Sequence, residues 1–464
     1  MSLDVLVLVL YALGMLLLGW IGMRRSKNQE DFLVAGRNLG PARYMSTMAA
    51  TVLGGASTIG SVRLGYVHGI SGLWLCATLG VGIVILNLFL AGPLIRLRIF
   101  TVTQVLERRY NPLTRRVSAV IMFAYALMIG VVSTLGISTV MQVFLNLSLP
   151  VAVLASGGIV VAYSTVGGMW AITLTDVVQF IIKTIGLLLI LLPVALHRAG
   201  GWDALVAHLP ASAFSFTAIG TGTIITYTLI YTFGILIGQD IWQRVFTART
   251  PGVARWAGTA AGFYCVLYGL GTALIGMCAR VLLPALPDVN NAFAAIIRFA
   301  LPDGLRSLII TAAVAAMMST ASAGLLAASS TLSEDLLPLV RGGRDSNMPL
   351  MRWCTFGTGV LVLTVALLVS DVLSALTLAY DLLVGGMLIP LMGAIFWKRA
   401  TPAAAMTSMF LGCAVALGFM VKDGIDANTP IYYSLAVGLV SFVAVSLLSP
   451  QQAGTATIAE GSVR

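Results

Sequence analysis

The chain consists largely of apolar stretches that are long enough to cross a lipid bilayer. Thirteen such stretches have about 18–30 residues each, which suits a straight, tilted or broken spanning helix. They cover residues 3–23, 44–67, 70–93, 117–145, 150–169, 173–196, 222–243, 254–283, 306–333, 351–370, 372–397, 403–421 and 430–449. Only 9% of the 464 residues are charged, against about 25% in soluble domains. The sequence therefore predicts an all-α polytopic membrane protein, with residues 1–464 forming a single integral membrane domain.

The Lys and Arg residues are divided unevenly between the two sides of this predicted topology. Twenty lie in loops on one side and five on the other. Because basic loops stay in the cytoplasm, we expect the N-terminus outside and the C-terminus inside, in the inner (plasma) membrane. Residues 450–464 then form a short, flexible cytoplasmic tail. This topology accounts for the net charge of +10, so we expect a lipid bilayer around the chain and no nucleic-acid partner.

Residue types that support enzyme chemistry are scattered in this sequence. The five cysteines lie within apolar stretches without CxxC or Cys/His spacing, and the three histidines lie near the ends of spans. No pattern typical of a structural metal, a disulfide framework or a nucleophile–base pair is visible. We therefore expect no enzymatic activity and no cofactor.

One apolar stretch, residues 312–335, carries seven hydroxyl side chains. Ser319 and Thr320 are adjacent there, and Ala316 lies one turn earlier with its carbonyl directed along the helix toward them. Such a cluster of hard, neutral oxygens suits a weakly held alkali cation. Small polar residues also pack spanning helices together. The stretch is thus either an ion site or a polar helix contact.

Glycines interrupt two of the predicted spans. Gly54 and Gly55 fall near the middle of the second span, and Gly234 and Gly238 lie in the seventh. Close packing through small residues is one interpretation. The other is a pair of unwound helices five spans apart, in two five-helix halves of opposite topology. Such a pair indicates the binding site of a secondary transporter, with residues 44–397 as the ten-helix core.

Three ionisable residues fall within predicted spans. Asp176 begins the sixth span, and Lys183 lies two helical turns later on the same face. Thr175 and Asp176 match an N-terminal helix cap, yet a charge in a spanning helix also indicates function. Lys183, and Arg63 in the second span, have a structural alternative: snorkelling to a headgroup or an internal ion pair.

Four stretches together resemble the sodium:solute symporters, the family of the sodium/proline, sodium/glucose, sodium/pantothenate and sialic acid transporters. They are FLVAGRNLGP (32–41), YSTVGGMWAITLTDVVQ (163–179), GQDIWQR (238–244) and MMSTASAGLLAASSTLSED (317–335). The resemblance runs from about residue 31 to residue 399. It implies the leucine-transporter-type fold, a five-plus-five inverted repeat formed by spans 2–11 with the other spans at the periphery.

The resemblance also implies a sodium site between the first and eighth helices of the core. The matching positions are the carbonyls of Ala50, Leu53 and Ala316 and the hydroxyls of Ser319 and Thr320. Asp176 matches an aspartate that some members use for coupling or a further sodium ion. Ser322 matches one of two paired serines of a second sodium site, although Ala323 replaces the other.

The implied function is sodium-coupled uptake of a small organic solute by alternating access. By position, the side chains that face the central cavity are Ser57, Thr58, Tyr231 and Gln239. Arg63 can pair with a substrate carboxylate, which favours an organic acid or amino acid. Sugar is disfavoured because Ser57 replaces a sugar-binding glutamine. Proline is disfavoured because Val52 stands where the proline transporters have an aspartate.

Two alternatives keep the same fold. Lys183 could serve as a tethered or titratable cation in a sodium-independent or proton-coupled transporter. The chain could instead bind a solute as a sensor without moving it. The sequence specifies no oligomeric state.

Overall fold

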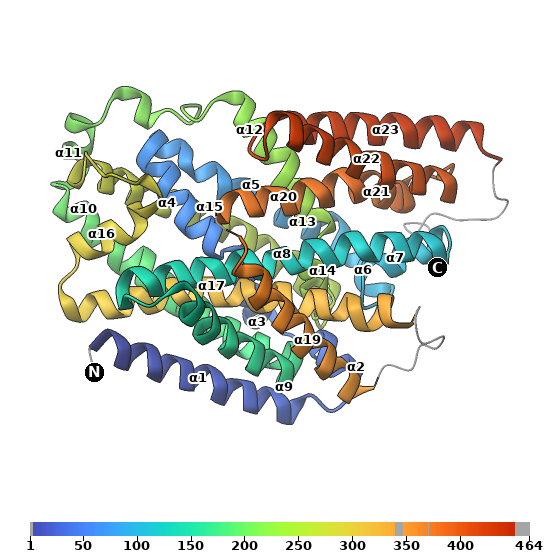
Figure 1. Ribbon diagram of the computed structural model, residues 1–464, viewed down its shortest axis with the longest axis horizontal. Helices are drawn as coiled ribbons and strands as arrows, with labels where there is room; N and C mark the ends of the chain where they lie inside the picture. The colour runs from blue at the N-terminus through green and yellow to red at the C-terminus, as the bar shows by residue number, and fades with distance from the viewer. Residues whose placement is uncertain (1–2, 339–346, 370, 451–464) are drawn as a thin grey trace.

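A computed structural model describes residues 3–338, 347–369 and 371–450 of the chain. Helices make up almost all of this part, and its one bridge between extended residues, Leu39 to Ala248, is isolated. Figure 1 shows many of the long helices lying side by side along the long axis of the molecule. The predicted all-α fold is confirmed. The predicted tail lies outside the described residues from position 451 onward.

The helices follow one another along the whole described chain. They are α1 (Leu3–Arg25), α2 (Gln29–Val34), α3 (Pro41–Val52), α4 (Gly55–His68), α5 (Trp74–Ile85), α6 (Ala91–Arg96), α7 (Thr103–Arg109), α8 (Pro112–Leu145), α9 (Leu149–Lys183), α10 (Leu192–Arg198), α11 (Gly201–His208), α12 (Thr221–Tyr227), α13 (Phe233–Ile237), α14 (Gln239–Val245), α15 (Pro251–Leu282), α16 (Ala292–Ala300), α17 (Asp303–Thr331), α19 (Met348–Ala366), α20 (Val372–Leu383), α21 (Ile389–Phe396), α22 (Pro402–Asp423) and α23 (Thr429–Leu448). Wider π-helical turns continue several of them, at Leu86–Leu90, Thr184–Leu191, Thr228–Thr232, Leu332–Leu336 and Val384–Leu388.

The number of membrane crossings is not settled by helix length alone. Ten helical stretches of the described chain are long and apolar enough to cross a membrane, or eleven if the bent pair α12–α14 counts as one. Two of them, Gly55–Arg96 and Leu149–Arg198, have 42 and 50 residues, about twice the 20 or so that one crossing needs. The count of thirteen is therefore not confirmed, and it stays a prediction together with the orientation.

The predicted loop between the fifth and sixth spans is absent from the described chain. Helix α9 is interrupted only at Gly168, where φ is +55°, a value that glycine adopts without steric cost. A Cβ atom there would lie 2.5 Å from the Phe32 carbonyl oxygen. Since the helix resumes at once, Asp176 lies well inside α9. The interpretation of Asp176 as a helix cap is therefore wrong.

Both predicted helix interruptions are confirmed. Helix α3 ends at Val52 and α4 begins at Gly55, with Leu53 and Gly54 outside helical geometry between them. A Cβ atom on Gly54 would lie 2.3 Å from Thr320 Oγ1, so only glycine allows this close approach to α17. The second interruption is at Gly238, where α12–α13 and α14 meet at 49°.

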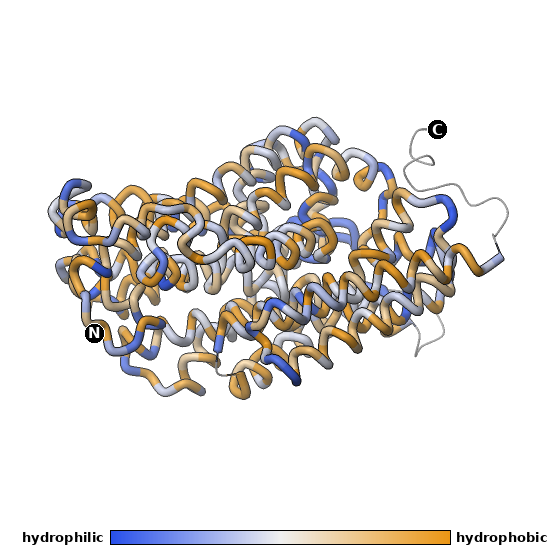
Figure 2. The backbone as a smooth tube through the Cα atoms, turned by 90° about the horizontal axis from the view of Figure 1, so that it is seen from above, coloured by the Kyte–Doolittle hydropathy of each residue, from blue (hydrophilic) through white to orange (hydrophobic). Residues whose placement is uncertain are grey.

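The broken helix α3–α4 lies in the interior of the bundle. It packs against α8, α9, α15 and α17, and α17 is 94% buried along its most apolar window, whereas α1 is 28% buried. Helices α1 and α23 lie at opposite edges of the view in Figure 1. Figure 2 shows hydrophobic residues along most of the length of the helices. The buried, broken helix is where a polar site can be assembled out of contact with lipid.

Candidate functional site

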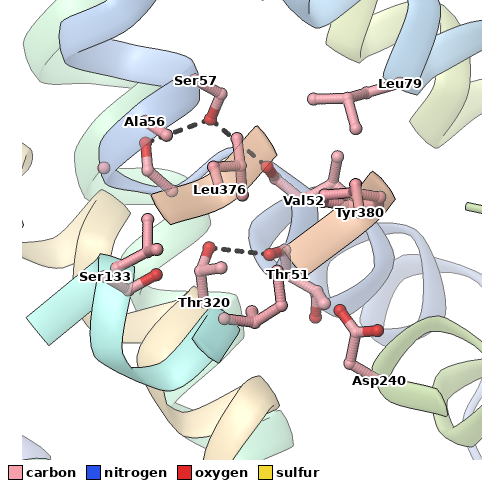
Figure 3. A pocket seen from close by; sticks show the side chains of 14 residues that line it. Thr51, Val52, Ala56, Ser57, Leu79, Ser133, Asp240, Thr320, Leu376 and Tyr380 are labelled. Carbon is pink, nitrogen blue, oxygen red and sulfur yellow. Dashed lines mark hydrogen bonds between the residues drawn. The ribbon is translucent and has the colours of Figure 1, made fainter. Parts of the chain in front are cut away.

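The C-terminal end of α3 leaves backbone carbonyls that the helix itself cannot satisfy. The Leu53 N–H donates to the Ala49 carbonyl (3.3 Å). The other partners come from α17: Ser319 Oγ donates to the Ala50 carbonyl (2.7 Å), and Thr320 Oγ1 donates to the Thr51 carbonyl (2.7 Å). Figure 3 shows the second of these bonds beside the cavity. The end of one helix is thus closed by hydroxyl groups of another.

Four of the five predicted sodium ligands converge at this point. Ser319 Oγ lies 2.7 Å from the Ala50 carbonyl oxygen and 2.9 Å from that of Ala316. The Leu53 and Ala50 carbonyls face a common point, because both contact one nitrogen atom of Lys183. Thr320 is the exception, since its hydroxyl binds Thr51 instead. The ligands are neutral oxygens, hard groups of the kind that suit an alkali cation.

Lys183 reaches the same carbonyls from α9. Its Nζ lies 3.5 Å from the Ala49 oxygen, 3.4 Å from that of Ala50 and 3.3 Å from that of Leu53. The side chain is completely buried. The helix widens into π-helical geometry directly after it. Two predicted sodium ligands are therefore in contact with the Lys183 amine.

Asp176 forms a buried polar cluster next to this site. The Thr47 hydroxyl donates to Asp176 Oδ2, and Arg244 Nη2 lies 3.7 Å from the same oxygen. All three side chains are wholly buried. The seventh predicted span ends at residue 243, which places Arg244 among the basic residues of the cytoplasmic loop that follows, and that placement is wrong. Arg244 belongs to α14, the second half of the other broken helix, and that half turns back into the bundle.

Ser322 lies one turn beyond Ser319 on α17. Its hydroxyl donates to the Ser319 carbonyl (3.0 Å) within the same helix. The Tyr163 hydroxyl, from α9, donates to the neighbouring Met318 carbonyl (3.4 Å). Ser322 is thus one helical turn from Ser319, one of the predicted sodium ligands.

A small cavity opens beside the interruption of α3–α4. Its volume is about 30 Å³, enough for two or three water molecules at roughly 10–15 Å³ each. Polar groups from four other helices face the first turn of α4 across it (Figure 3). The lining residues are Thr51, Val52, Gly54, Gly55, Ala56, Ser57, Leu79, Ile129, Val132, Ser133, Asp240, Thr320, Leu376 and Tyr380. An organic solute fits only after this cavity enlarges.

The predicted substrate residues do not all line the cavity. Ser57 lines the cavity, and its hydroxyl lies 3.1 Å from the Gly54 carbonyl. Thr58 is bonded to the Tyr268 hydroxyl (2.7 Å) of α15. Gln239 accepts from the Val102 N–H (2.8 Å) and donates to the Phe100 carbonyl (3.0 Å). Of these three, Ser57 alone lines the cavity.

Tyr231 and Arg63 lie next to the cavity without lining it. The Tyr231 hydroxyl is buried without a hydrogen-bond partner among the described residues. Its ring centroid lies 5.4 Å from that of Tyr380, which lines the cavity. Arg63 lines two larger cavities of about 250 and 320 Å³, and the first of them shares Ala56 with the central cavity. Arg63 therefore lies at an entrance to the site.

Several residues of the site were missed at the sequence level. Asp240, Tyr380 and Ser133 line the cavity, and Thr47 binds Asp176. Asp240 is part of the GQDIWQR stretch, so the sequence did offer a signal that could have identified it as a site residue. Asp381, on α20, is completely buried, and neither carboxylate oxygen has a hydrogen-bond partner in the described chain.

At one end of the bundle an ionic network holds three segments together. Arg115 of α8 lies 2.7 Å from Asp335, which follows α17, and 2.6 Å from Glu107 of α7. Asp335 is completely buried and also accepts from Thr101 (3.0 Å). Gln239 of α14 is bonded to Phe100 and Val102, just before α7, so these bonds and the ionic network link α7, α8, α14 and the end of α17.

Two broken helices, with carbonyls of one meeting hydroxyls of α17 in a buried cavity, define a multi-pass membrane transporter of the inverted-repeat type. The model of the sodium:solute symporter family matches residues 32–412. The chain belongs to the sodium:solute symporter family, a family of sodium-coupled transporters. The resemblance stated from the four stretches is confirmed.

Known relatives agree with this assignment over nearly the whole chain. The high-affinity proline transporter PutP of Bacillus subtilis (strain 168) is 24% identical over 467 residues, covering 95% of this chain and 98% of PutP. High-affinity choline transporter 1 of Drosophila melanogaster is 25% identical, covering 89% of this chain and 70% of that protein. A Na+-coupled sialic acid symporter, in a substrate-bound outward-open state, superposes with a TM-score of 0.87 at 18% identity, covering 97% and 98%. The predicted leucine-transporter-type fold is confirmed.

Proposed function

We propose that the chain couples the sodium gradient to the uptake of a small amino acid by alternating access. One observation carries the coupling: the carbonyls at the end of α3 converge with Ser319 of α17 across the helix break. A cation bound there contacts both helices at once, so its affinity depends on their distance. Differential affinity for two conformations is what couples an ion to transport.

Under this proposal Ala50, Leu53, Ala316, Ser319 and Thr320 hold the sodium ion. Thr320 joins the other four when its hydroxyl leaves the Thr51 carbonyl. Asp176 and Ser322 lie next to these ligands without binding the ion, and they influence the contact between α3 and α17. The sodium ion is a co-transported substrate of the protein.

The cavity favours a solute that carries both a carboxylate and an ammonium group. The first turn of α4, Gly55 to Ser57, lines it, and the free N–H groups of a helix N-terminus attract a carboxylate. The Asp240 carboxylate lies on the other side and suits an ammonium. Arg63 at the entrance attracts the carboxylate of an arriving solute.

The substrates named for the relatives fit this pattern in part. Proline carries both groups, and choline carries the cationic group. Val52 stands where the resemblance places the aspartate of proline transporters, so Asp240 supplies a carboxylate from another helix. We therefore propose an amino acid and leave proline among the solutes to be tested.

Transport requires the cavity to open alternately to the two sides. In the described conformation the Arg115 network and Gln239 close one end, while the cavities around Arg63 lie at the other. Release of the solute therefore requires the Arg115 network to separate.

Counterflow in proteoliposomes tests the proposal. Vesicles with the wild-type protein are loaded with unlabelled solute, and entry of labelled solute is followed for amino acids, choline and simple carboxylates, with sodium or potassium. We expect sodium-dependent exchange of an amino acid and none of choline or acetate. Asp240→Asn should raise the KM for that amino acid, whereas Asp203→Asn, at an exposed position of α11, should not.

Two results would contradict the proposal in different ways. Solute binding without counterflow indicates a sensor that moves nothing. Counterflow that is equal in sodium and potassium rejects sodium coupling and leaves the uptake of solute intact.

A further inference from the structure

The Lys183 ammonium is surrounded by carbonyl oxygens in the way that a bound metal cation is. An ammonium group has three N–H donors and no acceptor. Here three carbonyl oxygens, those of Ala49, Ala50 and Leu53, surround Nζ at 3.3–3.5 Å. Ala49 and Ala50 belong to the last turn of α3 and Leu53 directly follows it, at the helix end where the helix dipole places partial negative charge.

Asp176 is the acidic residue whose charge acts on this ammonium, and it is shared with another cation. Among the described residues no carboxylate forms an ion pair with Lys183, and Asp176, two turns earlier on α9, is paired with Arg244. Its other neighbours are Cys76, Cys265 and Tyr268. The Tyr268 ring centroid lies 5.9 Å from Nζ. The carbonyl oxygens of Ala49, Ala50 and Leu53 are therefore the groups in direct contact that stabilise the buried charge, and Asp176 adds attraction from beyond ion-pair distance.

These are in part the oxygens of the proposed sodium site. Ala50 and Leu53 belong to both sets, and the Ser319 hydroxyl contacts the same Ala50 carbonyl. Two unit charges cannot share the same carbonyls without strong repulsion in a buried environment. Either cation, but not both, is stabilised there.

We infer that the Lys183 ammonium is a tethered competitor of sodium, built into the chain, which holds the end of α3 when sodium is absent. The inference rests on the proposed cation site and adds a regulator of it. Sodium binds only after the ammonium has left the carbonyls, so Lys183 lowers the sodium affinity. The π-helical turn that begins at Thr184 gives this part of α9 the local irregularity that is often found at functional sites.

Sodium binding to purified full-length protein tests the inference. Binding of radioactive sodium is measured at constant ionic strength, with N-methylglucamine chloride as the replacement salt. Lys183→Met keeps the length of the side chain and removes its charge. We expect this variant to bind sodium at least about tenfold more tightly than wild type. Lys422→Met removes the same charge at an exposed position of α22 and should bind sodium as wild type does.

A second variant shows where the sodium binds. Adding Ser319→Ala to Lys183→Met should abolish the gain, because Ser319 completes the site. If Lys183→Met does not fold, Lys183→Gln keeps an amide donor for the carbonyls and carries the same expectation. Sodium affinity that is equal or weaker without the Lys183 charge overturns the inference, as does a gain that persists without the Ser319 hydroxyl.

The counterflow assay separates this failure from that of the proposed function. If wild-type protein exchanges an amino acid in a sodium-dependent manner but Lys183→Met shows no gain, only the tethered competitor is rejected. If wild-type protein exchanges no solute, the proposed transport is rejected, and the sodium titration still decides whether Lys183 competes.

Discussion

Removal of the Arg244 guanidinium should leave the Asp176 carboxylate as an uncompensated buried charge. Both side chains are completely inaccessible, and 3.7 Å separates Arg244 Nη2 from Asp176 Oδ2. The Thr47 hydroxyl remains as the donor to that oxygen. The other oxygen, Oδ1, has no hydrogen-bond partner in the described chain. Arg244→Met therefore removes the principal positive charge near Asp176 and preserves most of the side-chain volume.

The expected loss follows from what breaking a buried ion pair costs. Removing one partner typically costs about 3–5 kcal/mol, because the remaining charge stays buried and unpaired. Asp176→Asn leaves Arg244 in the same position and should cost a similar amount. With both changes the Asp176 charge is no longer stranded, and the loss of Arg244's attraction for the buried Asp240 carboxylate is common to the single and the double variant. The double variant should therefore lose at least about 2 kcal/mol less than the sum of the single losses.

Unfolding of the purified protein in mixed detergent micelles, titrated with sodium dodecyl sulfate, measures these free energies. Arg249→Met, at an exposed position close in sequence, is the control and should change the free energy of unfolding little. A loss below about 1 kcal/mol for Arg244→Met would place the pair in a solvated environment. Additive losses in the double variant would show that Asp176 and Arg244 do not interact, and either result refutes the reasoning.

Three further predictions concern the cation site and its cavity. Ser319→Ala should weaken sodium binding about tenfold or more, because a polar contact to a charged group contributes about 1.5–3 kcal/mol. The control is Ser156→Ala, which removes a hydroxyl that donates to the Ala152 carbonyl of its own helix at 2.7 Å. This control should leave sodium binding unchanged in the same titration. Gly54→Ala places a Cβ atom 2.3 Å from an oxygen of α17 and should cost about 1–3 kcal/mol in the micelle assay, whereas Gly304→Ala meets no atom within 4 Å and should cost nothing. Tyr231→Phe removes a buried hydroxyl that has no hydrogen-bond partner in the described part of the chain, so we expect a higher melting temperature together with weaker solute binding. A lower melting temperature would reveal a bond that this hydroxyl makes.

Local chemistry made parts of the site predictable. Ser319 and Ala316 lie one turn apart on one helix, so their proximity follows from helix geometry, and 2.9 Å separates the two oxygens. The break at Gly54 was predictable because a glycine pair near the middle of a span removes the side chains that favour a continuous helix. The length of α9 was not predictable, because a single glycine at 168 replaced the expected loop.

Contacts between distant segments could not be derived in this way. Arg244 is 68 residues from Asp176 in sequence, and GQDIWQR alone gives no sign that α14 turns into the bundle. Lys183 had both a structural and a functional interpretation, because its distance from Ala50 depends on how α9 packs against α3. Asp240 was visible as part of a motif, but its place in the cavity depends on the 49° bend at Gly238.

The sequence by itself determined that the chain is a helical membrane protein, where two helices break, and which helix offers hydroxyl oxygens. These properties depend on hydropathy, on glycine conformation and on neighbours within one or two turns, all of which act over short distances along the chain. The tertiary structure alone decided which side chains contact the carbonyls at the end of α3. The Ala50 carbonyl contacts both Ser319 and Lys183, because α3, α9 and α17 pack against one another and bring together residues more than 130 positions apart.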